Sequence, residues 1–262
     1  MSGNILETIA AHTRERVKEA KQQVTAEEMK RKALRMETDT GFPFEAALSG
    51  PDIGFICECK KASPSKGLIA PDFPYLQIAR EYEAAGAACI SVLTEPRWFL
   101  GENRYLKEIS EEVSIPCIRK DFTIDSYMIY EAKTLGASAV LLICSLLGRD
   151  TLRRYIGICD TLGLSALVEA HDEREIEDAV EAGARIIGVN NRDLKTFTVD
   201  VHNSERLRAL VPRSILFVAE SGIRTAEDIQ VLREAGVDGV LIGETLMRSA
   251  DKKKMLDGLR GI

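Results

Sequence analysis

Short apolar runs that end in a charged or amide side chain recur along the whole chain. Five of them are FICECKKASPS (55–65), IPCIRKDF (115–122), ALVEAHD (166–172), IIGVNNRD (186–193) and LFVAESG (216–222). Each run has the length and composition of a buried strand, and Gly, Ser, Asp or Asn then begins a loop. The pattern predicts a series of buried strands whose ends carry polar side chains.

A weak internal repeat predicts helices between these strands. The segments AAGAACISVL (84–93), TLGASAVLLI (134–143), EAGARIIGVN (181–190) and EAGVDGVLIG (234–243) each read as a helix end, a glycine and a strand. Glycine suits the residue after a helix, where a positive φ is common. With further apolar runs at 53–59, 115–119, 164–168 and 215–219, the chain is predicted to hold eight strands, each followed by about one helix.

Continuous apolar strands that alternate with helices favour a parallel sheet covered on both faces. The prediction is an α/β fold, a single (β/α)8 TIM barrel with an N-terminal helical extension. The alternative is an open doubly wound sheet, which usually carries a glycine-rich phosphate fingerprint after its first strand. Neither GxGxxG nor GxxxxGK[ST] follows any of the apolar runs.

Residues 1–50 lie outside the repeat and are predicted to form the helical extension, packed on a barrel domain of residues 51–262. Ile5, Leu6, Ile9 and Val17 approximate one face of a helix, with charged residues opposite. Two positions for this helix remain open: a cap on the bottom of the barrel, or a flap over the site.

Composition narrows the function. A net charge of −6 disfavours a nucleic-acid partner or an anionic membrane, either of which needs a basic surface. The six cysteines have no zinc-site spacing, so we interpret them as reduced, buried residues of a cytoplasmic protein, and we expect no metal site. No run is long enough to span a membrane, and the N-terminus lacks the apolar core of a signal peptide.

The carboxyl ends of barrel strands converge on one face, so the polar strand ends are predicted to form one site. These ends carry Lys60, Lys120, Glu169, Asn190 and Glu220. Because side chains alternate along a strand, Glu58 and Lys60 should face the barrel interior while the neighbouring cysteines face the helices. A charge there costs several kcal/mol unless it is paired or used, so either a structural ion pair or a functional role is implied.

The chemistry of these side chains suits acid–base catalysis. Lys120 could donate a proton to a carbonyl, with burial or neighbouring cations bringing its pKa toward neutral, or it could form a Schiff base. Glu169 could act as a base, or as an acid if desolvated, and Asn190 could hold sugar hydroxyls. His171 begins a loop before Asp172, a predicted helix N-cap, so we interpret it as structural.

The last two strand ends are typical of an anion site. ESGIRT (220–225) and IGETLM (242–247) place Gly222 and Gly243 where backbone N–H groups can approach a ligand ahead of a helix. Together with SPSKG (63–67) and Arg192, they predict a site for a phosphorylated sugar.

Seven ordered motifs over about residues 50–250 closely resemble the indole-3-glycerol phosphate synthase family of tryptophan biosynthesis. They are ECKKASPSKG (58–67), SVLTEPRWFLG (91–101), IRKDF (118–122), LVEAHD (167–172), GVNNRDL (188–194), AESGI (219–223) and LIGETLM (241–247). The resemblance implies closure of the indole ring of 1-(o-carboxyphenylamino)-1-deoxyribulose 5-phosphate, with loss of carbon dioxide and water. It implies no metal, no cofactor and no obligatory protein partner.

The resemblance also implies roles for individual residues. Lys120 would be the general acid, and Glu169 would assist the proton transfers of dehydration. Lys60 would pair with the anthranilate carboxylate and could also share in proton transfer. Glu58 and Asn190 would hold hydroxyls and orient the lysines, and Glu220 and Ser221 would complete the floor. The phosphate would be held by Ser63, Arg192, Gly222 and Gly243. The walls for the aromatic ring would be Phe99 and Phe122, with Trp98 either a third wall or part of the barrel rim. Glu244 stands where a serine can occur in the family, so only its backbone N–H is expected to contact phosphate.

Two rival functions remain open from the sequence. One is a Schiff-base aldolase that uses Lys60 or Lys120, and the other is a non-catalytic barrel that binds a phosphosugar. Four titratable groups at one mouth, those of Glu58, Lys60, Lys120 and Glu169, argue against the second.

Overall fold

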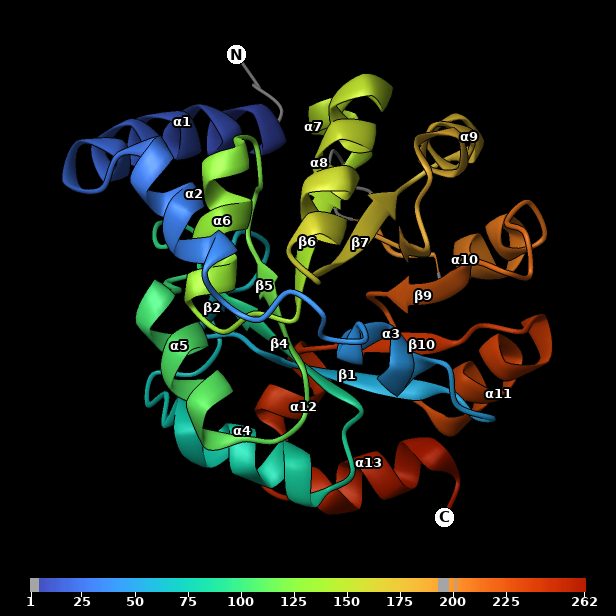
Figure 1. The fold of residues 1–262 in the computed structure, drawn as a ribbon. Coiled ribbons are helices and arrows are strands. Elements are labelled where there is room, and N and C mark those ends of the chain that lie inside the picture. The colour runs from blue at the N-terminus through green and yellow to red at the C-terminus, as the bar shows by residue number, and fades with distance from the viewer. Residues whose placement is uncertain (1–4, 193–197, 201) are drawn as a thin grey trace.

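The computed structural model describes residues 5–192, 198–200 and 202–262 (Figure 1). Three helices come first and a succession of strands and helices follows. The elements are α1 (Ile5–Gln23), α2 (Ala26–Leu34), α3 (Pro43–Leu48), β1 (Gly54–Cys59), β2 (Ala62–Ser63), β3 (Gly67–Leu68), α4 (Tyr75–Ala84), β4 (Cys89–Leu93), α5 (Asn103–Glu112), β5 (Cys117–Lys120), α6 (Ser126–Thr134), β6 (Ala139–Ile143), α7 (Cys144–Leu147), α8 (Arg149–Thr161), β7 (Ser165–Ala170), α9 (Glu173–Ala182), β8 (Ile186–Asn190), α10 (His202–Arg208), β9 (Leu216–Glu220), α11 (Ala226–Ala235), β10 (Gly239–Ile242), α12 (Glu244–Arg248) and α13 (Lys252–Arg260).

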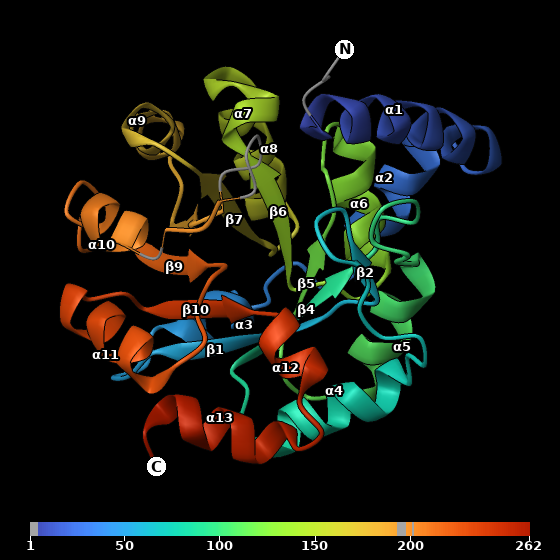
Figure 2. The same ribbon diagram turned by 180° about the vertical axis from the view of Figure 1, so that it is seen from behind.

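Eight of the strands close into a barrel in the order β1-β10-β9-β8-β7-β6-β5-β4, and every neighbouring pair is parallel. The helices surround the ring of strands (Figures 1 and 2). The predicted (β/α)8 barrel is therefore confirmed, and the open doubly wound sheet is excluded because β1 pairs with both β4 and β10.

The alternation of side chains along β1 separates two apolar cores. Cys57 and Cys59 belong to the outer core between strands and helices, whereas Ile56 belongs to the inner core. Glu58 lies between the two cysteines in sequence and faces inward, where it lines a cavity at the end of the barrel. All six cysteines are buried and free of disulfides, as predicted.

The four repeat glycines follow the ends of helices, as their position in the sequence predicted. Gly86, Gly136, Gly183 and Gly236 have φ between +76° and +89°, each just after a helix and before a strand. A residue with a Cβ is strained in this region, so these glycines turn the chain sharply from each helix into the next buried strand.

Helix α3 closes the bottom of the barrel. Phe44 and Leu48 are almost completely buried and pack with the residues at the amino ends of the strands. A Cβ on Gly54, the first residue of β1, would lie 2.8 Å from Leu48 Cδ2. The side chain of Leu48 thus occupies the space that the glycine leaves open, and it seals the inner core from solvent.

Helix α1 lies at the opposite end of the barrel, beside the mouth. Arg16 donates a hydrogen bond of 2.7 Å to Asp121 Oδ1 and one of 3.3 Å to the carbonyl oxygen of Thr94. Both acceptors directly follow barrel strands at their carboxyl ends. Of the two positions that the sequence left open, α1 takes the one over the site, and the bottom is covered by α3.

Two small features were not predicted: the β2–β3 hairpin and α7. The hairpin follows β1 and is fastened to the loop after β4, because the Ala62 N–H donates to the Phe99 carbonyl oxygen at 3.2 Å. No helix among the residues described is long and apolar enough to cross a membrane.

Replacing Phe44 should test the role of α3 as a plug. We expect Phe44→Ala to lower the free energy of unfolding by about 3–5 kcal/mol, because it leaves a cavity in a fully buried site. Urea unfolding followed by fluorescence would measure the loss. Leu34→Ala, at an exposed leucine of α2, is the control and should shift the free energy by less than about 0.5 kcal/mol. Equal effects of the two changes would contradict the plug.

Candidate active site

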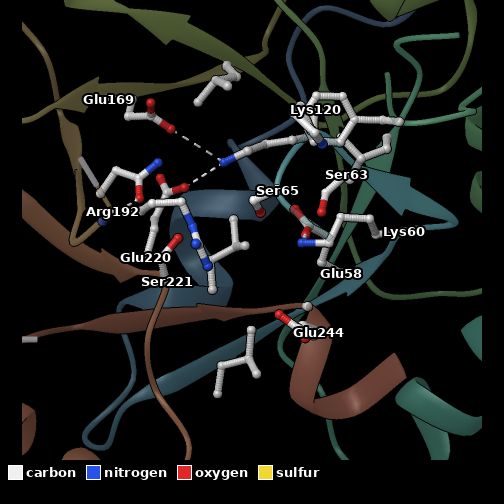
Figure 3. Close-up of a pocket in the computed structure, with 18 of the residues that line it drawn as sticks. Glu58, Lys60, Ser63, Ser65, Lys120, Glu169, Arg192, Glu220, Ser221 and Glu244 are labelled. Carbon is white, nitrogen blue, oxygen red and sulfur yellow. Dashed lines mark hydrogen bonds and ion pairs between the residues drawn. The ribbon is translucent and has the colours of Figure 1, made fainter. Parts of the chain in front are cut away.

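Lys120, at the end of β5, lies at the centre of the barrel mouth. Its Nζ is 2.5 Å from Glu220 Oε2 and 3.6 Å from Glu169 Oε2 (Figure 3). The two carboxylates stand at the carboxyl ends of β9 and β7. Three strands that are far apart in sequence thus bring one ammonium and two carboxylates together, as the strand-end pattern predicted.

The electrostatic setting of Lys120 differs from the prediction. Burial disfavours its charged form, but the carboxylates of Glu220, Glu169 and Glu58 outweigh burial and raise the pKa of Lys120 above its usual range. The expectation that burial or neighbouring cations would bring this pKa toward neutral is therefore wrong. Burial in turn raises the pKa of Glu220 to about 7, although Lys120 opposes the shift.

Gly188, in the middle of β8, makes room for Glu220. A Cβ at this position would lie 2.4 Å from Glu220 Oε1 and 3.2 Å from Leu167 Cδ1. No role for this residue was predicted from the sequence. The available signal was a glycine inside an otherwise β-branched strand, which often marks the close approach of another group.

Glu58 and Lys60 form a second charged pair in the mouth. Lys60 Nζ lies 2.5 Å from Glu58 Oε1, and the buried Ser91 hydroxyl donates to Glu58 Oε2 at 3.5 Å. Gly243 lies directly beneath the pair, because a Cβ there would be 2.4 Å from Glu58 Oε1 and 2.8 Å from Lys60 Nζ. The absence of a side chain at Gly243 therefore lets both charges lie across the end of β10.

The turn after β9 is held by Asn191, a residue that was not predicted from the sequence. Asn191 donates from Nδ2 to the Ser221 carbonyl oxygen at 3.2 Å, and its Oδ1 accepts from the Ser204 hydroxyl at 2.7 Å. Ser221 and Gly222 have φ of +69° and +84°. A serine in this left-handed region is strained, and such strain is concentrated at functional sites.

Asn190 and Arg192 are joined by a short local contact. Asn190 Oδ1 accepts the backbone N–H of Arg192 at 3.0 Å, and both side chains line the cavity. The end of the motif GVNNRDL, residues 193 and 194, lies outside the described residues.

A cavity of about 180 Å³ at the mouth is lined by every residue predicted for the site except Trp98. They are Glu58, Lys60, Ser63, Phe99, Lys120, Phe122, Glu169, Asn190, Arg192, Glu220, Ser221, Gly222, Gly243 and Glu244. The lining also includes Ile5 and Ile9, which were not predicted as site residues, and Ser65, Arg224 and Thr245, which lie within the predicted phosphate motifs but were not singled out. Ile5 and Ile9 come from α1, so the N-terminal helix forms part of the cavity wall.

Aromatic residues form one side of the cavity. The rings of Phe99 and Phe122 lie 6.0 Å apart at an interplanar angle of 41°, and both line the cavity. Trp98 instead packs edge-on against His12 of α1, with ring centroids 5.3 Å apart. Of its two predicted positions, Trp98 takes the one in the rim.

Glu244, the first residue of α12, faces two cations. Its Oε1 is 3.8 Å from Lys66 Nζ and 3.1 Å from Arg248 Nε. Within the described residues, no group of three or more His, Cys, Asp or Glu side chains is arranged to hold a metal ion.

Comparisons with known proteins identify the family of this chain. The family model for indole-3-glycerol phosphate synthase matches residues 6–259. A relative from Ruminiclostridium cellulolyticum with that name is 60% identical over 257 residues, which cover 98% of this chain and 99% of the relative. Another from Lachnoclostridium phytofermentans is 51% identical over 98% of this chain and 99% of its own length.

The chain belongs to the indole-3-glycerol phosphate synthase family. It is accordingly a decarboxylating carbon–carbon lyase of tryptophan biosynthesis, and the resemblance read from its motifs is confirmed.

Solved structures support the fold alone. A thiamine phosphate pyrophosphorylase from Pyrococcus furiosus aligns with a TM-score of 0.58 at 16% identity, over 80% of this chain and 94% of that one. A chain of the tryptophan synthase complex from the same organism aligns with a TM-score of 0.60 at 14% identity, over 80% and 99%.

Adding one methyl group at Gly188 should disturb this indole-3-glycerol phosphate synthase site. We expect Gly188→Ala to lower kcat at least about tenfold, because the new Cβ displaces the Glu220 carboxylate from Lys120. Steady-state kinetics would measure the change, with circular dichroism to verify the fold.

Gly157→Ala is the matched control for Gly188→Ala. Gly157 is an exposed residue of α8, and no atom lies within 4 Å of the position that an added Cβ would take. This variant should keep wild-type kcat and gain up to about 1 kcal/mol of stability from helix propensity. Wild-type kcat in Gly188→Ala would show that the position of Glu220 is unimportant.

Proposed function

We propose that this chain closes the indole ring of 1-(o-carboxyphenylamino)-1-deoxyribulose 5-phosphate to give indole-3-glycerol phosphate, carbon dioxide and water by lysine and glutamate acid–base catalysis. The observation that carries the proposal is Lys120, held at 2.5 Å and 3.6 Å by two carboxylates at the mouth of a barrel from this family. The residue roles are those that the resemblance to the family implies, and all of these residues line the cavity.

Lys120 is the general acid that protonates the substrate carbonyl as the aromatic ring attacks. Its raised pKa keeps the ammonium charged at neutral pH, so the proton is in place when substrate arrives. A Schiff-base mechanism needs the neutral amine as nucleophile, and the surrounding carboxylates disfavour that form. The aldolase alternative is therefore the weaker one.

Lys60 binds the anthranilate carboxylate. In the structure its ammonium is paired with Glu58 at 2.5 Å. When substrate binds, the anthranilate carboxylate takes the place of Glu58 as partner, so the positive charge of Lys60 stays compensated. Glu58 is then available to accept a hydrogen bond from a substrate hydroxyl. Asn190 holds a second hydroxyl, and Glu220 and Ser221 complete the floor beneath the sugar.

Glu169 carries the proton transfers of the dehydration step. It is almost fully buried, and one of its oxygens already faces Lys120 at 3.6 Å. Low exposure strengthens the charge interactions of a carboxyl group and excludes bulk water from the transfer.

The phosphate is held by Ser63 of β2 and, at the ends of β8, β9 and β10, by Arg192 and the N–H groups of Gly222 and Gly243. Glu244 would repel an anion there, but Lys66 and Arg248 offset its charge. Its backbone N–H, at the start of α12, still points into a region favourable to negative charge.

The anthranilate ring lies against Phe99 and Phe122, whose rings already line one wall. Ring closure with loss of carbon dioxide and water requires no external oxidant or reductant, so we expect no cofactor and no metal. The small phosphorylated substrate is the expected partner, without nucleic acid, membrane or an obligatory protein. We also propose a cytoplasmic location, which the six unpaired, buried cysteines support.

The proposal is tested directly by mixing the purified chain with 1-(o-carboxyphenylamino)-1-deoxyribulose 5-phosphate and following indole fluorescence. Formation of the fluorescent product supports the proposed reaction. A folded chain that binds the substrate without converting it would instead support the non-catalytic phosphosugar-binding barrel. Trapping of a covalent adduct by borohydride would support the aldolase.

Removing the ammonium of Lys120 should affect turnover more than binding. We expect Lys120→Ala to lower kcat by about 10²–10⁴-fold with little change in KM, because proton donation is worth this much. Lys120→Arg keeps the positive charge between the carboxylates but is a far weaker acid, and it should be nearly as slow. A kcat near that of the wild type in either variant would contradict the role of Lys120 as general acid.

Removing the guanidinium of Arg192 should affect binding more than turnover. We expect Arg192→Ala to raise KM by about ten- to a hundredfold with a smaller change in kcat, because a charge-assisted contact to phosphate is worth about 1.5–3 kcal/mol. Arg174→Ala, at an exposed position of α9, is the control and should leave both constants unchanged. An unchanged KM in Arg192→Ala would count against a phosphate contact.

A further inference from the structure

His171, just beyond the end of β7, contacts two carboxylates at once. Its Nδ1 lies 3.1 Å from Glu175 Oε2 of α9, and its Nε2 lies 3.5 Å from Glu169 Oε1. The imidazole therefore stands between the carboxylate assigned to dehydration and the first turn of a helix on the outside of the barrel. From the sequence alone, this histidine was interpreted as structural.

The hydrogen-bond partners of His171 fix its tautomer. Glu175 Oε2 also accepts the backbone N–H of His171 at 2.9 Å. An ionised carboxylate can only accept hydrogen bonds, so Nδ1 must be the donor. The ring nitrogen that remains, Nε2, is the one that faces Glu169.

One proton must lie between His171 Nε2 and Glu169. Nε2 is buried and makes no hydrogen bond to any of the residues described. Without a proton between them, the lone pair of Nε2 would face the lone pairs of Glu169 Oε1 at 3.5 Å, and this contact is repulsive. The pair therefore holds a proton, either as imidazolium with carboxylate or as imidazole with carboxylic acid.

The surroundings favour the imidazolium form. The charged groups that face the ring are Glu169 on β7, Glu175 on α9 and, at longer range, Glu220 on β9. Burial disfavours the charge, but the hydrogen bond to Glu175 and the three negative charges outweigh it and raise the pKa of His171 to about 9. Asn203, which donates to the His171 carbonyl oxygen, carries no charge.

The His171 side chain lies nearer to solvent than that of Glu169, although its Nε2 is buried. The His171 side chain is 20% exposed, whereas that of Glu169 is 4% exposed. The proposed reaction takes up one proton per turnover, because carbon dioxide leaves from a carboxylate and its charge must be replaced. A buried Glu169 needs a group through which protons reach it, and its Oε2 is already directed at Lys120.

We propose that His171 is a positioning residue that fixes the Oε1 atom of Glu169 and supplies it with a proton from solvent in every turnover. This inference rests on the proposed function and deepens it. The Nε2–H bond breaks as an O–H bond forms on Glu169, and Glu169 then passes that proton to the leaving hydroxyl, which departs as water. The neutral imidazole keeps its hydrogen on Nδ1, and Nε2, which is buried beside Glu169, takes up the next proton from a hydronium ion or buffer acid after the ring turns toward solvent.

Kinetics of His171→Asn test the inference. We expect kcat to fall by about tenfold or more while KM changes less than about twofold, as for loss of a proton-transfer group. We expect the wild-type kcat to fall as the pH rises through the pKa of His171, about 9, and this basic limb should disappear or move in His171→Asn. Added imidazole should restore part of kcat in His171→Ala, which a purely structural role would not allow.

His202→Asn is the matched control. His202 on α10 makes the same kind of contact, Nδ1 to Glu205 Oε2 at 3.1 Å, but its side chain is 71% exposed and the carboxylate that it contacts does not line the cavity. This variant should have wild-type kcat and an unchanged pH profile. A His171→Asn variant with wild-type kcat and an unchanged pH profile would overturn the inference.

Glu175→Gln provides a second test if the histidine variants fail to fold. It keeps a side-chain acceptor for the His171 N–H but removes one negative charge beside the ring. We expect the basic limb to move to lower pH, because the imidazolium loses part of its stabilisation. An unchanged limb would mean that His171 does not set it, and the inference would fail.

Nitrogen-15 NMR of the histidine side chains tests the shared proton without any substrate. The chain has only three histidines, so the His171 signals are assigned by difference from the variants. We expect His171 to titrate near pH 9 and Glu169→Gln to lower that midpoint. A midpoint near the ordinary value of about 6.5, unaffected by Glu169→Gln, would overturn the inference, whereas failure of the wild type to form the indole product would overturn only the proposed reaction.

Discussion

The ion pair between Lys120 and Glu220 determines how the rest of the barrel mouth is built. It joins β5 to β9, two strands with three others between them in the ring. Buried charges are costly unless they are paired with good geometry. This requirement explains the bare backbone of Gly188, which leaves space for Glu220, and the approach of Glu169 from β7. An excess of carboxylates then keeps Lys120 protonated, so the same pair that satisfies the folding requirement retains the proton that we propose Lys120 donates.

The N-terminal extension stabilises both ends of the barrel by different means. At the bottom, α3 inserts apolar side chains that complete the inner core. At the mouth, Arg16 of α1 is bound to Asp121, the residue after Lys120. Asp121 is fully buried, and although burial opposes its charge, Arg16 and Arg119 lower its pKa. The segment that carries Lys120 and Phe122 is therefore held by α1 from outside the ring, and this links a helix outside the repeat to the chemistry.

Many of the site residues could be predicted from the order of residue types along the chain. The strand ends could be predicted because a parallel barrel brings them to one face whatever the details of packing. The resemblance to the family supplied further site residues that do not stand at strand ends, including Phe99 and Ser63. The main error has a clear physical origin. The pKa of Lys120 was expected to approach neutral because burial alone acts in that direction, and only the structure shows that carboxylates from three other strands outweigh it.

The sequence by itself determined the barrel, the helix-ending glycines and the set of side chains at the mouth, because these depend on local patterns and on a topology that those patterns specify. Only the tertiary structure decided which charges face one another. Glu220 contacts Gly188 and Lys120 across separate strands, and Glu169 approaches Lys120 from a third strand. Their energies depend on distances of a few ångströms, and no spacing along the chain encodes those distances.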